Sequence, residues 1–222
     1  MRSLELPGGG TLPQLGLGTW HMGESEGRRQ AMEVAAVRAA IDMGYRLIDT
    51  AEMYGEGGAE EVVGQAVAQV LRSGEVSREE LFIVSKVYPH NASRKGTALA
   101  CDRSRRRMGL EHIDLYLLHW RGAHPLAETC DAMESLVAQG HIGRWGVSNF
   151  DTDDMDELAA LPQGARCATN QVYYALADRA VGHQRHAALA LPRQQAELRP
   201  PLAHRVVHLV RRAVQRLAAH GS

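Results

Sequence analysis

Apolar residues along the first 180 positions occur either in short continuous runs or at helical spacing. The run LFIVSKV at 81–87 is apolar on both faces, which is typical of a strand in a parallel sheet covered by helices. The stretch 28–43 instead places apolar residues three and four positions apart and is followed by Gly44, a suitable helix end. The order therefore begins with a strand and a helix, and the same alternation continues along the chain.

This alternation predicts about six strand-helix units, preceded by a short hairpin. The hairpin is expected in SLEL, PGGG and TLPQL, where the turn consists of residues that tolerate unusual backbone angles. The strands are expected at 15–20, 45–50, 81–87, 113–120, 141–150 and 167–175, and the helices at 28–43, 58–72, 96–109, 125–139 and 153–160. Such a series indicates either a doubly wound sheet or a (β/α)8 barrel of the TIM type.

Two features favour the barrel. The glycine pattern GxGxxG, which opens the helix of a dinucleotide-binding Rossmann unit, follows none of the expected strands. Polar residues and one tryptophan also recur at the carboxyl ends of successive strands, where barrel enzymes place their active sites. These residues are Trp20, Asp49, Lys86, His119, Ser148, Asn149 and Gln171.

Composition limits the classes of function. The 222 residues are 45% hydrophobic and 23% charged, with a net charge of −1, so nothing indicates a nucleic-acid or membrane partner. Apolar runs fall short of the ~20 residues that span a bilayer, and MRSLELPGGG lacks the apolar core of a signal peptide, so we expect a cytoplasmic protein. Cys101, Cys130 and Cys167 lie far apart without CxxC spacing, and we expect neither disulfides nor a metal site.

Three of these polar residues, together with Tyr54 on the glycine-rich turn after Asp49, fit one kind of chemistry. The chain has only two lysines, Lys86 and Lys95, so an ammonium group at a strand end is a selective choice. A tyrosine has a pKa of ~10, and a nearby lysine lowers it by stabilising the phenolate. Asp49 would hold Lys86, Tyr54 would donate a proton, and His119 would orient a carbonyl oxygen. Taken singly, each also has a plain structural reading, as a solvent-reaching lysine, a capping aspartate, a loop tyrosine or a core histidine.

The ordered motifs resemble the aldo-keto reductase family. The matching segments are LGLGTW, DTAEMYG, the strand ending VSKV, LYLLHW, GVSNF and NQVYY, in family order and spacing over residues 3 to about 179. The resemblance implies that Asp49, Tyr54, Lys86 and His119 form the catalytic tetrad. It implies an oxidoreductase that reduces an aldehyde or ketone with NADPH, with NADH left open. The cofactor-binding residues that it implies are Thr19, Trp20, Asp49, Ser148, Asn149 and Gln171.

The pattern changes at about position 183. The segment 183–222 contains seven Arg, one Glu and five His but no Ile, Phe, Tyr, Trp, Met, Lys or Asp. We therefore divide the chain into a partial barrel at 1–182 and an off-pattern tail at 183–222. The tail could be a frameshift product, a natural interaction segment or part of a remodelled barrel. Helical spacing of its apolar residues predicts a helix over 204–219.

An incomplete barrel would have physical consequences. Unpaired edges beside the first and sixth strands favour self-association, because a free strand edge is a template for pairing. Without the loops after a seventh and eighth strand, where barrels bind phosphate, NADPH binding and activity are expected to be impaired. Two other functions stay open: a lyase that forms a Schiff base on Lys86, and a catalytically silent binding, regulatory or nonfunctional protein.

Overall fold

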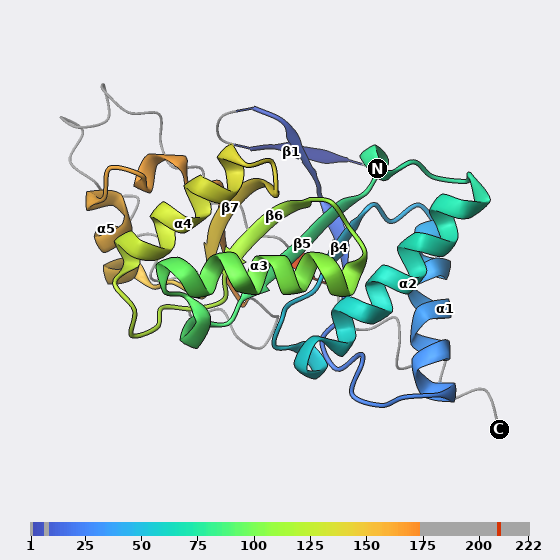
Figure 1. The fold of residues 1–222 in the computed structure, drawn as a ribbon. Helices are drawn as coiled ribbons and strands as arrows, with labels where there is room; N and C mark the ends of the chain where they lie inside the picture. The colour runs from blue at the N-terminus through green and yellow to red at the C-terminus, as the bar shows by residue number, and fades with distance from the viewer. Residues whose placement is uncertain (1, 7–8, 174–207, 210–222) are drawn as a thin grey trace.

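A curved parallel sheet with helices along its outer face forms the body of the protein (Figure 1). The computed structural model describes residues 2–6, 9–173 and 208–209. The strands of this sheet are β3 (Leu15–Gly18), β4 (Leu47–Asp49), β5 (Phe82–Val87), β6 (Ile113–Leu118), β7 (Ile142–Ser148), β8 (Asn170–Gln171) and β9 (His208–Leu209). From β3 to β8 each strand pairs with the next along the chain, always in parallel. A doubly wound sheet would reverse its strand order, so the predicted incomplete barrel is confirmed.

Within the described residues, five α-helices follow the strands at the predicted places. They are α1 (Arg28–Asp42), α2 (Gly58–Ser73), α3 (Arg94–Met108), α4 (Leu126–Ala138) and α5 (Thr152–Ala160). Ser93 begins α3 by accepting a hydrogen bond from the Gly96 amide, and Asp151 begins α5 with a capping box. Gly44 follows α1 with φ 95°, a left-handed conformation that glycine adopts without strain.

Four short 3₁₀ helices lie in the connections and were not expected from the sequence pattern. They are η1 (Tyr54–Gly57), η2 (Arg78–Glu80), η3 (Pro89–Asn91) and η4 (Gly164–Arg166). Two of them follow strands that carry candidate site residues, because η1 comes after β4 and η3 after β5. These short helices therefore determine where the chain turns after leaving the sheet.

The curved sheet has an apolar core on each face. On the outer face the core lies between the strands and the helices, and it includes Val37, Ile48, Ile83 and Tyr116. On the inner face a smaller cluster lies against the N-terminal hairpin of β1 (Ser3–Glu5) and β2 (Thr11–Pro13). That inner cluster consists of Leu6, Leu12, Leu47, Val84, Leu115, Leu117 and Ala168. The hairpin therefore covers the inner face with leucine side chains.

Most of the tail lies outside the described residues, and so does the proposed boundary between positions 182 and 183. The two described tail residues, His208 and Leu209, form strand β9, which pairs in parallel with Leu15 and Gly16 of β3. They lie within the range expected to be a helix at 204–219, and they are in a strand instead. The edge of β3 that was expected to be unpaired therefore has a partner over these two positions.

The helices and cysteines of the described part of the chain bear on two expectations from composition. No helix there is long and apolar enough to cross a membrane. Cys101, Cys130 and Cys167 are all buried and free. Burial raises the pKa of each of these thiols to about 12, so all three are protonated at neutral pH.

Candidate active site

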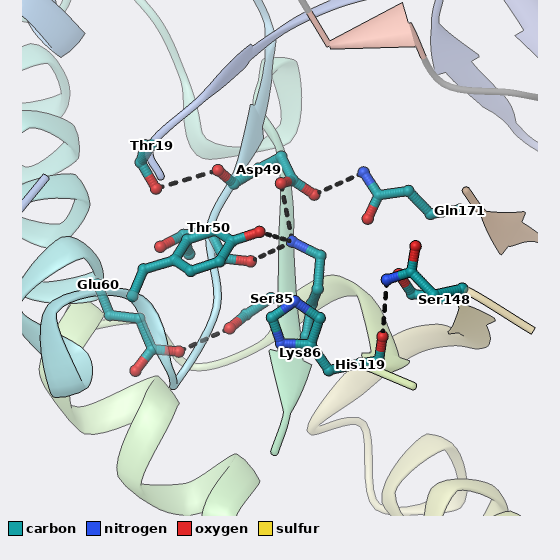
Figure 2. Close-up of polar contacts among 11 residues, drawn as sticks. Thr19, Asp49, Thr50, Glu60, Ser85, Lys86, His119, Ser148 and Gln171 are labelled. Atoms are coloured by element: carbon teal, nitrogen blue, oxygen red, sulfur yellow. Dashed lines mark hydrogen bonds and ion pairs between the residues drawn. The ribbon is translucent and has the colours of Figure 1, made fainter. Parts of the chain in front are cut away.

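The candidate site residues meet at the carboxyl ends of the strands, the end at which the sequence placed them (Figure 2). Asp49 ends β4, Lys86 lies one residue before the end of β5, His119 directly follows β6 and Gln171 ends β8. All four side chains are buried. Because these parallel strands leave the sheet on one side, residues far apart in the chain form one cluster, which we call the rim site.

Lys86 is the centre of the rim site. Its Nζ atom donates to Asp49 Oδ2 at 2.8 Å, to the Thr50 carbonyl oxygen at 2.8 Å and to the Tyr54 hydroxyl at 3.3 Å. Burial works against a charged amine, but the Asp49 carboxylate and the Tyr54 hydroxyl more than offset it, so the pKa of Lys86 is raised. The ammonium ion is therefore fully satisfied although it is only 2% exposed.

Tyr54 reaches Lys86 from η1, on the connection that leaves β4. The backbone of this turn is left-handed at Gly55, Glu56 and Gly57, with φ values of 55°, 51° and 98°. Space is also tight here, since a Cβ atom on Gly55 would lie 2.6 Å from the Gly23 carbonyl oxygen. The glycines of DTAEMYGEGG thus allow a narrow turn, which places the Tyr54 hydroxyl beside the Lys86 ammonium.

The sequence argument gave the direction in which Lys86 acts on the pKa of Tyr54 but did not include burial, and the net shift of this pKa is upward. Burial makes the largest single contribution and raises the pKa of Tyr54, and together with the Asp49 charge it outweighs the lowering caused by Lys86. Lys86 does act in the expected direction, through its charge and through its hydrogen bond. The phenol is therefore firmly protonated at neutral pH.

His119 lies beside Tyr54 and is neutral. The two rings make an edge contact, with centroids 5.6 Å apart and planes at 73°. Burial, together with the positive charge of Lys86, lowers the pKa of His119 to about 3. Its Nδ1 atom is buried and has no hydrogen-bond partner among the described residues. A neutral imidazole can donate one hydrogen bond to a ligand without carrying a charge.

The residues that were expected to hold a cofactor lie around the same cluster. Gln171 donates from Nε2 to Asp49 Oδ1 at 3.0 Å, while its Oε1 atom is buried without a partner in the described part of the chain. Asn149 donates to the His119 carbonyl oxygen at 3.2 Å and to Ser148 Oγ at 3.1 Å. A buried acceptor with no partner marks a place where a ligand amide would be accommodated.

Two further residues of this group lie at the end of β3. Thr19 donates to the Asp49 carbonyl oxygen at 3.1 Å and is completely buried. Trp20 is 49% exposed, and its ring stacks at 6.5 Å from that of Tyr54. Thr19 therefore helps to fix Asp49, whereas Trp20 provides an apolar surface at the mouth of the rim site.

Two buried glutamates lie close to the rim site, Glu52 within the motif DTAEMYG and Glu60 in α2, and sequence reasoning assigned a role to neither. Glu52 accepts hydrogen bonds from the Tyr88 amide, from Asn91 and from Arg103. Glu60 accepts from Ser85 Oγ at 2.6 Å and from Arg107 at 3.0 Å. Glu52 was open to reading as an ordinary turn or cap residue. The available signal for Glu52 was a carboxylate shortly after a buried strand, with an arginine-rich helix some 50 residues later.

Comparisons with known proteins agree with this geometry. The model of the Aldo/keto reductase family matches residues 14–190. "Methylglyoxal reductase YeaE" of Escherichia coli is 48% identical over 203 residues, which cover 91% of this chain and 67% of that protein. "Glyoxal reductase" of Bacillus subtilis is 40% identical over 70% of this chain and 52% of its own length.

Solved structures are similar as well. An aldo-keto reductase from Klebsiella pneumoniae in complex with NADPH has a TM-score of 0.75 and 47% identity, covering 88% of this chain and 65% of its own. A second Klebsiella pneumoniae structure, with NADP and acetate, has a TM-score of 0.76 and 45% identity over 92% of this chain and 66% of its own. The chain thus spans between about half and two thirds of the length of the relatives it matches.

Proposed function

The chain belongs to the aldo/keto reductase family, and we propose that it reduces small aldehydes or ketones at the rim site, with NADPH as reductant. The observation that carries this proposal is the contact between the Lys86 ammonium and the Tyr54 hydroxyl, held in place by Asp49. Reduction of a carbonyl group needs a proton at the oxygen as hydride reaches the carbon. A buried phenol beside a fixed ammonium ion can supply that proton.

Tyr54 is the general acid in this proposal. Its raised pKa keeps the hydroxyl protonated until a basic oxygen develops nearby. As the carbonyl oxygen gains negative charge it accepts the Tyr54 proton, and the Lys86 ammonium then stabilises the phenolate that is left. Asp49 and the Thr50 carbonyl oxygen keep the ammonium charged and in position. None of these groups has to move far, because their contacts already exist in the protein.

His119 orients the substrate in this proposal. Since its pKa is about 3, the imidazole is neutral throughout the physiological range and does not compete with Tyr54 as an acid. A neutral ring N–H can donate a hydrogen bond to the carbonyl oxygen, which turns that oxygen toward the Tyr54 hydroxyl. Trp20, half exposed beside the Tyr54 ring, covers the apolar side of a small carbonyl compound.

The residues present fit the nicotinamide end of the cofactor. The unpaired Gln171 Oε1 atom can accept a hydrogen bond from the carboxamide NH₂ group, while Asn149 and Ser148 lie at the end of the next strand. Thr19 and Trp20 line the adjoining wall at the end of β3. NADPH, when bound, supplies the hydride. We choose NADPH over NADH because the two Klebsiella pneumoniae relatives were crystallised with NADPH or NADP.

Methylglyoxal is the first substrate to test, because relatives of this chain are named methylglyoxal reductase and glyoxal reductase. The alternative function as a Schiff-base lyase is less well supported. A Schiff base needs a neutral, accessible amine. Lys86 has a raised pKa and is surrounded by three acceptors.

Carbonyl-dependent oxidation of NADPH separates the reductase from a silent binding protein, and the strength of NADPH binding is a separate question. The sequence predicts that the loops that would bind the cofactor phosphates are missing. The part of the chain that bears on this prediction, residues 174–207 and 210–222, lies outside the described residues. We propose that binding is weak, so a fluorescence titration should give a dissociation constant well above the micromolar range. A micromolar dissociation constant would show that the protein still binds the phosphates of NADPH.

The catalytic role is tested by Tyr54→Phe. This change removes only the hydroxyl, so NADPH oxidation driven by methylglyoxal should fall by about 10²–10⁴-fold, the usual contribution of a general acid. The control is Tyr45→Phe, a partly buried tyrosine that packs against the outer core. Full activity in Tyr54→Phe would show that another group supplies the proton.

A further inference from the structure

Glu52 links the two segments that carry the acid and the amine. It lies three residues after Asp49 and two before Tyr54, and its side chain is only 8% exposed. Its Oε2 atom accepts the Tyr88 amide at 3.0 Å, and its Oε1 atom accepts from Asn91 at 2.9 Å and from Arg103 at 2.6 Å. A buried carboxylate with three donors is well satisfied and costly to disturb.

The backbone of Glu52 binds the same neighbouring segment. Its amide donates to the Lys86 carbonyl oxygen at 3.2 Å. In a parallel ladder, a residue that donates to one neighbour accepts from the amide two positions further along. Here that amide belongs to Tyr88, and the acceptor is the Glu52 carboxylate. The side chain of Glu52 therefore continues the pairing of β4 with β5 beyond the last residue of β4.

This extension fixes the Tyr54 hydroxyl relative to Lys86. Tyr54 is only two residues from Glu52, and Lys86 is two residues from Tyr88. The hydrogen bonds of the Glu52 carboxylate, which we call the clamp, therefore hold both chain segments beside the 3.3 Å contact between Lys86 Nζ and the Tyr54 hydroxyl. Arg103 brings α3 to the same carboxylate and compensates its charge from the outer side. If the clamp were lost, the turn after β4 could shift and carry the phenol away from the ammonium ion.

We propose that Glu52 is a positioning residue for the general acid of this protein. The inference rests on the proposed function in so far as it concerns turnover. The structural part of the inference is that Glu52 sets the contact between Tyr54 and Lys86, and this part does not depend on turnover. The hydrogen bonds of the Glu52 carboxylate go to Tyr88, Asn91 and Arg103 and not to Tyr54 or Lys86, so in this proposal Glu52 acts by holding the two segments together.

The chain offers a matched control in Glu60. Glu60 is also a buried carboxylate, also pairs with an arginine of α3, and also bonds to a residue of β5. Its partner on β5 is the side chain of Ser85, on the outer side of the sheet, and not the segment that follows the strand. A change at Glu60 should therefore disturb packing between the sheet and the helices without moving Tyr54.

The experiment compares Glu52→Gln with Glu60→Gln in the full chain, with its tyrosines labelled with ¹³C at Cζ. Glutamine keeps one acceptor but turns an NH₂ group toward donors, so residue 52 loses either the bond from Tyr88 or the two bonds from Asn91 and Arg103. The Tyr54 Cζ resonance, assigned by its absence in Tyr54→Phe, should move in Glu52→Gln and stay in place in Glu60→Gln. Both variants should melt at a lower temperature than the unchanged protein.

Turnover gives a second readout. With NADPH and methylglyoxal, Glu52→Gln should lower kcat by about 10–100-fold and leave KM unchanged, because a misplaced catalytic group slows chemistry more than binding. An unmoved Tyr54 resonance in Glu52→Gln would overturn the positioning role whatever the rate. If instead the resonance moves while Tyr54→Phe retains full activity, the positioning role stands and the assignment of the acid fails.

Discussion

The inner face of the curved sheet is apolar along its N-terminal half and polar at its carboxyl rim, although the same strands supply both regions. Leu47 precedes Asp49 by two residues, and Val84 precedes Lys86 by two. In each pair the first residue lies in the leucine-rich cluster beside the hairpin and the second in the rim site. A step of two positions keeps a side chain on the same face of a strand.

The two regions differ in what makes burial favourable. In the apolar half, each side chain is stabilised simply by leaving water. At the rim, burying an ammonium ion and a carboxylate costs free energy that only their mutual contacts offset. The apolar half can therefore tolerate changes of shape at a moderate cost. The rim depends on every partner being present, and three predictions test this difference.

The largest effect is expected from Lys86→Met. Methionine has a similar length but no charge, so the Asp49 carboxylate would be left buried without its counterion. The free energy of unfolding should fall by about 3–5 kcal/mol in a denaturant titration. The double variant Asp49→Asn, Lys86→Met should recover a large part of this loss. Equal stability of the single and double variants would contradict the idea that the uncompensated charge is the cause.

A somewhat smaller effect is expected in the apolar half, from Leu12→Ala. Leu12 is 1% exposed and packs from the hairpin into the inner cluster, so its truncation leaves a cavity. The free energy of unfolding should fall by about 2–4 kcal/mol. The hydrogen bonds around Lys86 should persist, so the Tyr54 Cζ resonance should not move. Leu99→Ala on α3, where the leucine is 49% exposed, serves as the control. Equal losses in the two variants would contradict the assignment of Leu12 to the core.

The smallest effect is a pH dependence that comes from His119. Its pKa is about 3 in the folded protein, against 6.5 for an unperturbed histidine, so between these values the unfolded chain binds a proton that the folded protein does not. Measured only between pH 6.5 and about 5, the free energy of unfolding should therefore fall by up to about 1.4 kcal/mol per pH unit, in total by less than about 2 kcal/mol. His119→Gln should show a shallower fall between about pH 5 and the ordinary histidine pKa. If the free energy of unfolding depended on pH equally in the two proteins, the pKa of His119 would not be lowered by folding.

Much of the fold could be predicted from the sequence, because its signals are local. The run at 81–87 and the helical spacing at 28–43 each depend on neighbouring residues alone, and β5 and α1 lie where they were expected. The convergence of Asp49, Lys86 and His119 could also be predicted, because the carboxyl ends of parallel strands lie on the same side of the sheet. Tyr54 was assigned from its chemistry beside a lysine and from the family resemblance, because its position on a turn could not be derived from periodicity.

The parts that sequence reasoning missed depend on contacts between distant segments. The net rise in the pKa of Tyr54 is set by how deeply the ring is buried, which no local pattern reports. The bonds of Glu52 to Tyr88, Asn91 and Arg103 join three elements. Strand β9 replaces the helix that apolar spacing predicted at His208 and Leu209, because pairing with β3 overrides a local preference.

The hydrogen bond from Gln171 to Asp49 has a geometric consequence for the whole sheet. These residues are 122 positions apart and end strands that have three other strands between them. Their bond is thus a chord across the arc that the strands describe, and for a given number of strands the length of that chord sets the radius of the arc. Flattening of the wall would stretch this chord and tighter bending would shorten it, so either change would alter the orientation of the Asp49 carboxylate.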